Sequence, residues 1–153
     1  MRHLIFSSLF IFSLSCESNK KSEIILDVKS IVNKSPKETE HLLGKPDSTY
    51  TVRILGKPIY CQRYVKNNIE IQYPENLATD IVVYGPHGLA FNQSALKAFN
   101  IDYKTNHPDE YMKDRLIRWL DVDEFSTITF YNPELDSAGR IMNFTIFFKA
   151  KGG

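Results

Sequence analysis

The sequence lacks the residue groupings that most catalytic and metal sites require. No His-x-x-x-His or Cys-x-x-Cys spacing occurs, and the later histidines, His41, His87 and His107, lie far apart in the chain. Metal sites of the usual structural kinds need ligands clustered at short, regular spacings. Glycine-rich phosphate loops are also absent, and Ser94 has no Gly-x-Ser-x-Gly setting. We therefore expect no metal, no cofactor and no catalytic activity.

The sequence also lacks an excess of one charge. It has 19 Lys and Arg residues against 18 Asp and Glu residues. Arg2 is the one basic residue among the first 15, so the remaining 138 residues carry 18 of each sign. Binding to nucleic acid depends on a concentrated basic surface, which a balanced composition does not favour. The sequence predicts no nucleic-acid partner.

What the chain does have is an N-terminal segment with the three parts of an export signal. Arg2 and His3 supply a short positive region, and residues 4–15 form a mainly apolar run without charge. The small residue Ser15 stands directly before Cys16. A membrane-spanning helix needs about 20 apolar residues, and this run has only 12. We predict that residues 1–15 are a cleaved signal peptide.

The residues ending at Cys16 resemble a lipobox, the signal of bacterial lipoprotein processing. They differ from the common pattern, which has Leu three residues before the cysteine, because Ser13 stands there and Leu14 follows it. The resemblance implies a diacylglycerol thioether and an amide-linked acyl chain on Cys16. Two or three chains make a durable anchor, so we expect membrane attachment in the cell envelope, at the outer membrane. The alternative is a secreted protein with a cysteine near its N-terminus.

Acylation of Cys16 would leave Cys61 without a partner for an intrachain disulfide. Cys61 lies in a strand-like run, residues 59–65. One interpretation is a small buried apolar residue, and the other is a reactive thiol, which needs a nearby base or cation. The local sequence supplies no activating group, which favours burial.

Composition and length predict one α+β domain of residues 24–153, preceded by a polar tether of residues 16–23. The expected architecture is short helices on an antiparallel meander sheet. Residues 71–75 and 130–134 share a short pattern. Two tandem helix-plus-meander units are therefore an alternative organisation, with subunits 24–86 and 87–153.

The clearest helix signal begins at Ser35. Ser35 can cap the helix, Pro36 suits its first position, and Glu38 completes a capping box. Gly44 predicts the end of this helix. The apolar residues 24–32 before it fit either a helix or a strand.

Further elements follow from apolar alternation and turn residues. A second short helix is expected over residues 93–99, between Asn92 and Asn100, and a helical turn over residues 107–114. A loop is expected over residues 132–139. The expected strands are residues 49–55, 59–65, 69–73, 78–84, 115–121, 125–131 and 140–149.

The helix end Leu43-Gly44-Lys45-Pro46, followed by the aromatic strand residues 60–64, resembles an element of small bacterial envelope proteins. It is similar to SmpA/OmlA-type lipoproteins of outer-membrane assembly and to the β-lactamase-inhibitor-like fold. The resemblance covers about half of the chain beyond the signal. It implies a scaffold rather than an activity, since a fold does not determine a function.

Tyr60, Gln62 and Tyr64 share one face of their predicted strand. Aromatic side chains with a polar tip suit protein interfaces. If helices cover the other face of the sheet, these three residues form a partner-binding surface. The alternative is that the tyrosines pack in the core.

These observations predict a lipid-anchored, non-catalytic module that binds an envelope protein. The alternative is an envelope hydrolase or small-ligand carrier with a site assembled from distant residues. That alternative requires a deep pocket with convergent polar groups, such as His87, His107 or Asp102.

Overall fold

The computed structural model describes residues 24–86, 88–102 and 107–152. The predicted signal peptide, Cys16, the whole predicted tether and His87 lie outside the described residues.

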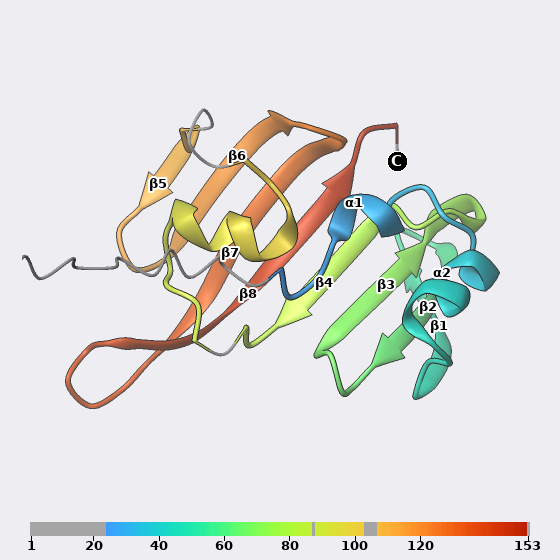
Figure 1. The fold of residues 1–153 in the computed structure, drawn as a ribbon, viewed down its shortest axis with the longest axis horizontal. Helices are drawn as coiled ribbons and strands as arrows, with labels where there is room; N and C mark the ends of the chain where they lie inside the picture. Colours follow the sequence, from blue (N-terminus) through green and yellow to red (C-terminus); the bar gives the residue numbers. More distant parts are fainter. Residues whose placement is uncertain (1–23, 87, 103–106, 153) are drawn as a thin grey trace, which may run out of the picture.

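One antiparallel sheet of eight strands forms the body of the protein (Figure 1). The strands lie in the order β1-β2-β3-β4-β8-β7-β6-β5. Strands β1 to β4 form one meander and β5 to β8 another, and the pairing of β4 with β8 joins the two. The strands are β1 (Ser48–Ile54), β2 (Lys57–Tyr64), β3 (Ile69–Tyr73), β4 (Asp80–Tyr84), β5 (Glu110–Met112), β6 (Leu116–Val122), β7 (Phe125–Leu135) and β8 (Ile141–Ala150).

The helices are short and lie over one face of this sheet (Figure 1). They are α1 (Val28–Ile31), α2 (Pro36–Leu43) and the 3-10 helix η2 (Gln93–Phe99), with a further 3-10 turn, η1 (Pro74–Asn76), after β3. The predicted antiparallel sheet with short helices is confirmed. The fold is nevertheless largely β, so the α+β class describes it only in part.

The helix α2 begins and ends where its sequence signals predict. The Ser35 Oγ accepts a hydrogen bond from the Glu38 N–H, and the Glu38 carboxylate accepts one from the Ser35 N–H at 2.9 Å. This capping box satisfies two backbone donors that no helical carbonyl can reach. At the other end Gly44 has a φ of 84° and its N–H donates to the Glu40 carbonyl.

The core lies between the sheet and the helices. A row of apolar residues crosses the sheet in register, from Ile71 through Ile81, Phe148 and Ile128 to Trp119. All five side chains are fully buried. Burying such a side chain contributes about 1.5–3 kcal/mol. Because the row passes from β4 to β8 without a break, it unites the two meanders around a single core.

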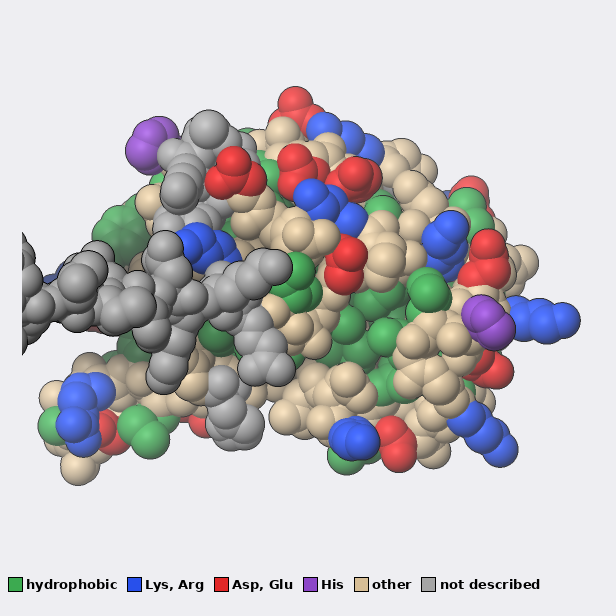
Figure 2. Space-filling model, viewed as in Figure 1, with side chains coloured by type: hydrophobic (Ala, Val, Ile, Leu, Met, Phe, Trp, Pro, Cys, Tyr) green, Lys and Arg blue, Asp and Glu red, His purple; other side chains and the backbone are tan. Residues whose placement is uncertain are grey.

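Figure 2 views the helix-covered face, with charged side chains around its rim and apolar side chains visible between the helices. The residues before α2, whose state the sequence leaves open, form α1 and bury Val28 and Ile31 against the sheet. The N–H groups of Ile25 and Leu26 both donate to the Ala98 carbonyl, which ties this segment to η2.

The prediction of a helical turn over residues 107–114 is wrong. Glu110–Met112 forms the edge strand β5, in register with Leu116–Arg118 of β6. A segment of three residues shows too little periodicity to indicate a strand by itself. Pairing with the neighbouring strand decides its conformation.

The predicted loop over residues 132–139 is also too long. Strand β7 continues to Leu135, and the hairpin that it forms with β8 projects beyond the helices (Figure 1). Phe144, Ile146 and Phe148 point into the core as their alternation predicts, whereas Met142 is 64% exposed. The described helices do not extend to the tip of this hairpin, and Met142 remains exposed there.

Candidate binding face on the open side of the sheet

Tyr60, Gln62 and Tyr64 do share a face of β2, but it is the face that α2 covers. Gln62 is 0% and Tyr64 2% exposed, and Tyr60 is half-buried against the core. The expectation that these residues form an open surface is therefore corrected. They pack under α2 because their register puts them on the same side as Ile71 and Tyr73.

Gln62 is the polar centre of this buried contact. Its amide nitrogen donates to the Pro36 carbonyl at 3.3 Å and to the Glu40 carboxylate at 3.1 Å. Its amide oxygen accepts hydrogen bonds from the hydroxyls of Tyr64 and Tyr73. Buried polar groups stabilise a fold only when such partners are present. The cluster therefore fixes α2 on the sheet.

The opposite face of the sheet is the surface that the described helices leave uncovered; we call it the open face. The register places Arg63 of β2 beside Glu70 of β3, and Glu70 beside Val82 of β4. On β8 the open face carries Phe147 and Lys149. Since successive side chains of a strand point to opposite faces, the whole open face follows from this register.

A carboxylate lies at the centre of the N-terminal half of the open face. Glu70 accepts hydrogen bonds from the hydroxyls of Tyr50 and Tyr84 and, at 3.0 Å, from the amide of Gln72. The Arg63 guanidinium lies 3.8 Å from the same carboxylate and 4.0 Å from the centre of the Tyr84 ring. These contacts join strands β1 to β4 across the face.

Burial raises the pKa of Tyr84, and the negative charge of Glu70 raises it further, against the opposing effect of Arg63. Burial also raises the pKa of Tyr50, and its hydrogen bond to Glu70 and the charge of Glu70 raise it further. Both phenols therefore stay protonated at neutral pH and act as hydrogen-bond donors. The Glu70 carboxylate has a guanidinium and three neutral donors around it. Its role is therefore to hold neighbouring strands of the open face together.

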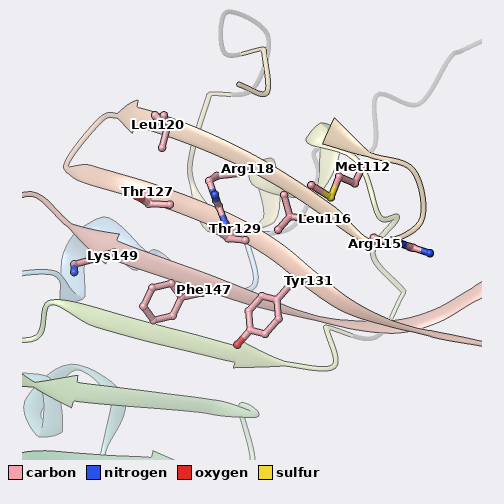
Figure 3. A pocket seen from close by; sticks show the side chains of 10 residues that line it. All are labelled: Met112, Arg115, Leu116, Arg118, Leu120, Thr127, Thr129, Tyr131, Phe147 and Lys149. Carbon is pink, nitrogen blue, oxygen red and sulfur yellow. The ribbon is translucent and has the colours of Figure 1, made fainter. Parts of the chain in front are cut away.

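The C-terminal half of the open face forms a groove of about 780 Å³ across β5, β6, β7 and β8 (Figure 3). Its apolar side chains come from all four strands. Met112 and Leu120 are about half exposed, at 50% and 51%. The apolar residues that line the groove are Met112, Leu116, Leu120, Tyr131 and Phe147.

Three basic side chains line the same groove: Arg115, Arg118 and Lys149 (Figure 3). Arg118 forms an ion pair with Glu110 of β5, with 2.7 Å between its Nη1 and the carboxylate. The groove thus combines an apolar floor with cationic groups, which suits it to binding rather than to proton transfer. The alternation of Leu116, Arg118 and Leu120 on one face of β6 is the sequence signal that identifies part of it.

Cys61 lies on the open-face side of β2 but is fully buried. Burial, helped by the charge of Glu70, raises the pKa of its thiol to about 11. A thiol of this pKa is almost entirely protonated at neutral pH and a poor nucleophile. The prediction of a buried, unreactive Cys61 agrees with this environment.

Of the residues named for a site assembled from distant positions, Asp102 and His107 are exposed, on either side of residues 103–106, and His87 lies outside the described residues. His41 is exposed on α2. Within the described residues no group of three His, Cys, Asp or Glu side chains is arranged to hold a metal ion. No helix among them is long and apolar enough to span a membrane.

Comparisons of this chain with protein-family models, with curated proteins and with solved structures find no match.

Proposed function

We propose that this chain is a lipid-anchored, non-catalytic module of the bacterial cell envelope that binds a protein partner through its open face. The observation that carries the proposal is the groove over β5–β8, whose apolar side chains the described helices leave uncovered. Contiguous exposed apolar groups on a soluble domain are typical of interaction sites.

The polar groups of the open face support a binding role over a catalytic one. Tyr50, Gln72 and Arg63 all contact the Glu70 carboxylate. A general base needs a carboxylate aimed at a substrate proton. Here the carboxylate is engaged by its own neighbours.

The anchor is proposed from the sequence. A charge-free run ending in Ser15 precedes Cys16, and a polar segment separates Cys16 from the first described residue. Acyl chains on Cys16 would hold the module at a membrane, while residues 16–23 would leave it room to reach its partner.

We also propose that the fold is built from two tandem helix-plus-meander units. The strand order supports this organisation, because β1 to β4 and β5 to β8 follow one another inward from opposite edges. The helix α2 precedes the first meander and η2 precedes the second.

Two experiments test the proposed function. In the first, the Cys16→Ser chain is expressed in a bacterial host and the membranes are separated from the soluble fraction. The wild-type chain is expected in the membrane fraction and labelled by a palmitate analogue. The variant is expected to be unlabelled and to leave the membrane or remain unprocessed. Labelling of the variant, or its normal processing and retention, would contradict the anchor.

The second experiment tests the face. Three chains are purified with their partners from detergent-solubilised envelope: the wild type, the groove variant Met112→Glu/Leu120→Glu and the control variant Leu42→Glu. Leu42 is equally exposed, at 50%, but lies on α2. The partner is expected to be lost from the groove variant alone. Equal recovery with all three chains would rule out the open face as the binding surface.

A further inference from the structure

The groove over β5–β8 carries charge of one sign. Arg115, Arg118 and Lys149 line it, and none of the described residues that line it is acidic. The whole chain is close to neutral, with 19 basic and 18 acidic residues. The positive character of the groove is therefore a local property of the register that brings these strands together.

Two of the three cations are available to a ligand. Among the described residues, neither Arg115 nor Lys149 forms an ion pair. Lys149 does stand opposite Asp80 in the register, and its charge lowers the pKa of Asp80 against the larger, raising effect of burial. Arg118 already holds the carboxylate of Glu110. A guanidinium has five donors, so one carboxylate leaves Arg118 donors for another. The Glu110 contact shows that the Arg118 guanidinium can accommodate a carboxylate.

The dimensions of the groove suit a short extended chain. Four neighbouring strands, about 4.8 Å apart, span about 14 Å. An extended peptide advances about 3.3 Å per residue, so about four or five residues cross the groove. Alternate side chains of such a peptide point to one side, where the floor offers Leu116, Leu120 and Phe147.

We infer that the groove binds an extended acidic segment of the partner protein, in which acidic and large apolar residues take turns at the positions that face the groove. These positions are two residues apart in an extended chain. The apolar side chains pack on Leu116 and Phe147, and the carboxylates pair with Arg115, Arg118 and Lys149. The inference rests on the proposed function in one respect, that the partner is a protein. Charge complementarity identifies the chemistry of the segment.

Peptide titration with the full chain in detergent tests this inference. The probes are three fluorescent seven-residue peptides with Leu and Phe at the third and seventh positions and Glu, Gln or Lys at the first and fifth. These four positions face the same side of an extended chain, and the other positions are Ser. The Glu peptide is expected to bind at least tenfold more tightly than the Lys peptide, with the Gln peptide between them. The affinity of the Glu peptide should fall as salt is added, because salt screens exposed charges.

The variants Arg115→Gln/Lys149→Gln and Lys45→Gln complete the test. Lys45 is an exposed cation in the connection between α2 and β1. The double variant is expected to weaken the Glu peptide about tenfold, and the Lys45 variant to leave its affinity unchanged. Equal affinity for the Glu and Lys peptides, or an unchanged affinity in the double variant, would overturn the inference. The inference would also be overturned if the double variant lost binding to phosphatidylglycerol vesicles but kept its affinity for the Glu peptide.

The outcome is separable from that of the proposed function. In one outcome, Met112→Glu/Leu120→Glu loses the partner but the wild-type chain binds the Glu, Gln and Lys peptides equally. The open face then remains the binding surface, and the acidic segment is refuted. Selective binding of the Glu peptide without any partner lost from that variant would support the groove chemistry and refute the proposed function.

Discussion

Gln62 of β2 and Glu40 of α2 are joined by a hydrogen bond of 3.1 Å between the amide nitrogen and the carboxylate. The two residues are 22 positions apart in the chain. Gln62 is fully buried and Glu40 is exposed, so this contact links the inside of the sheet to the outer side of the helix. It also explains why the face with Tyr60 and Tyr64 is closed to a partner.

Replacing Gln62 with Ala is expected to destabilise the protein by about 2–4 kcal/mol. The change removes the hydrogen-bond partner of the Tyr64 and Tyr73 hydroxyls, which are both buried. Each buried group left without a partner costs about 1–3 kcal/mol, whereas the exposed Glu40 carboxylate can turn to water. Urea unfolding followed by circular dichroism measures the loss. The matched control is Lys45→Ala, for which we expect a change under about 0.5 kcal/mol. Equal midpoints for the two variants would show that the Gln62 cluster is not stabilising.

Stability is expected to fall between pH 9 and pH 11 through Cys61. The pKa of its thiol is raised from 9.0 to about 11 by burial, so the unfolded chain loses its proton first. The stability contributed by the protonated, buried thiol is fully present below pH 9 and is lost as the pH rises through the pKa of the folded state. Each pH unit in this window costs at most about 1.4 kcal/mol.

The measurement compares Cys16→Ser with Cys16→Ser/Cys61→Ala by urea unfolding at pH 8, 9, 10 and 11. The stability of the chain that retains Cys61 should decline more steeply with pH. Both chains carry the same tyrosines, so the difference in slope reports on the ionisation of Cys61 and on the effect of its charge on the pKa of Tyr50. Parallel curves would contradict the burial of the thiol, as would rapid reaction of Cys61 with a thiol reagent at pH 8 in the folded chain.

Gly85 follows β4 at a position where a side chain does not fit. It has a φ of 55°, and a Cβ there would lie 2.8 Å from the side-chain amide of Asn143 on β8. Gly85→Ala should therefore cost about 1–3 kcal/mol, from backbone strain and from displacement of Asn143.

Gly56→Ala is the control for strain alone. Gly56 has a φ of 81° in the turn between β1 and β2, and nothing lies within 4 Å of its Cβ position. Thermal unfolding should show the larger loss for Gly85→Ala. A smaller loss there than at Gly56 would mean that the approach of Asn143 is unimportant.

Trp119 is the one tryptophan of the chain and is fully buried, with its ring centre 5.0 Å from that of Phe130. Its fluorescence should be blue-shifted and protected from acrylamide in the folded protein, and it should shift to the red in urea. Trp119→Ala should cost about 3–5 kcal/mol through the cavity that it leaves. Leu120→Ala, next to it on the open face, should cost far less because Leu120 is half exposed. A red-shifted, freely quenched spectrum in the native state would refute this packing.

Some elements of the fold are predictable from local sequence alone. The helix α2 begins at its capping box and ends at Gly44 because caps act within one turn. Strand β3 has the predicted limits, Ile69–Tyr73, since its alternating pattern is bounded by turn residues. Strand β5 was missed because its three residues, Glu110–Met112, are held by pairing with β6.

The candidate site was only half predictable. Tyr60, Gln62 and Tyr64 do lie on one face, since the two-residue period of a strand requires it. Which face the helices cover depends on contacts distant in the chain, such as Gln62 with Glu40. Arg118 and Phe147 enter the groove from β6 and β8, which the predicted meander places on either side of β7, but no local pattern reveals that the helices leave this face open.

The sequence by itself determined the local periods of the strands, the limits of α2, the balance of charge and the export-like segment before Cys16. Each of these depends on residues within a few positions of one another. The tertiary structure alone decided that β4 pairs with β8, that Gln62 is buried, and that Arg115, Arg118 and Lys149 share a groove with Phe147. The physical reason is that burial of the core selects one face of the sheet for the helices. The other face is then left open.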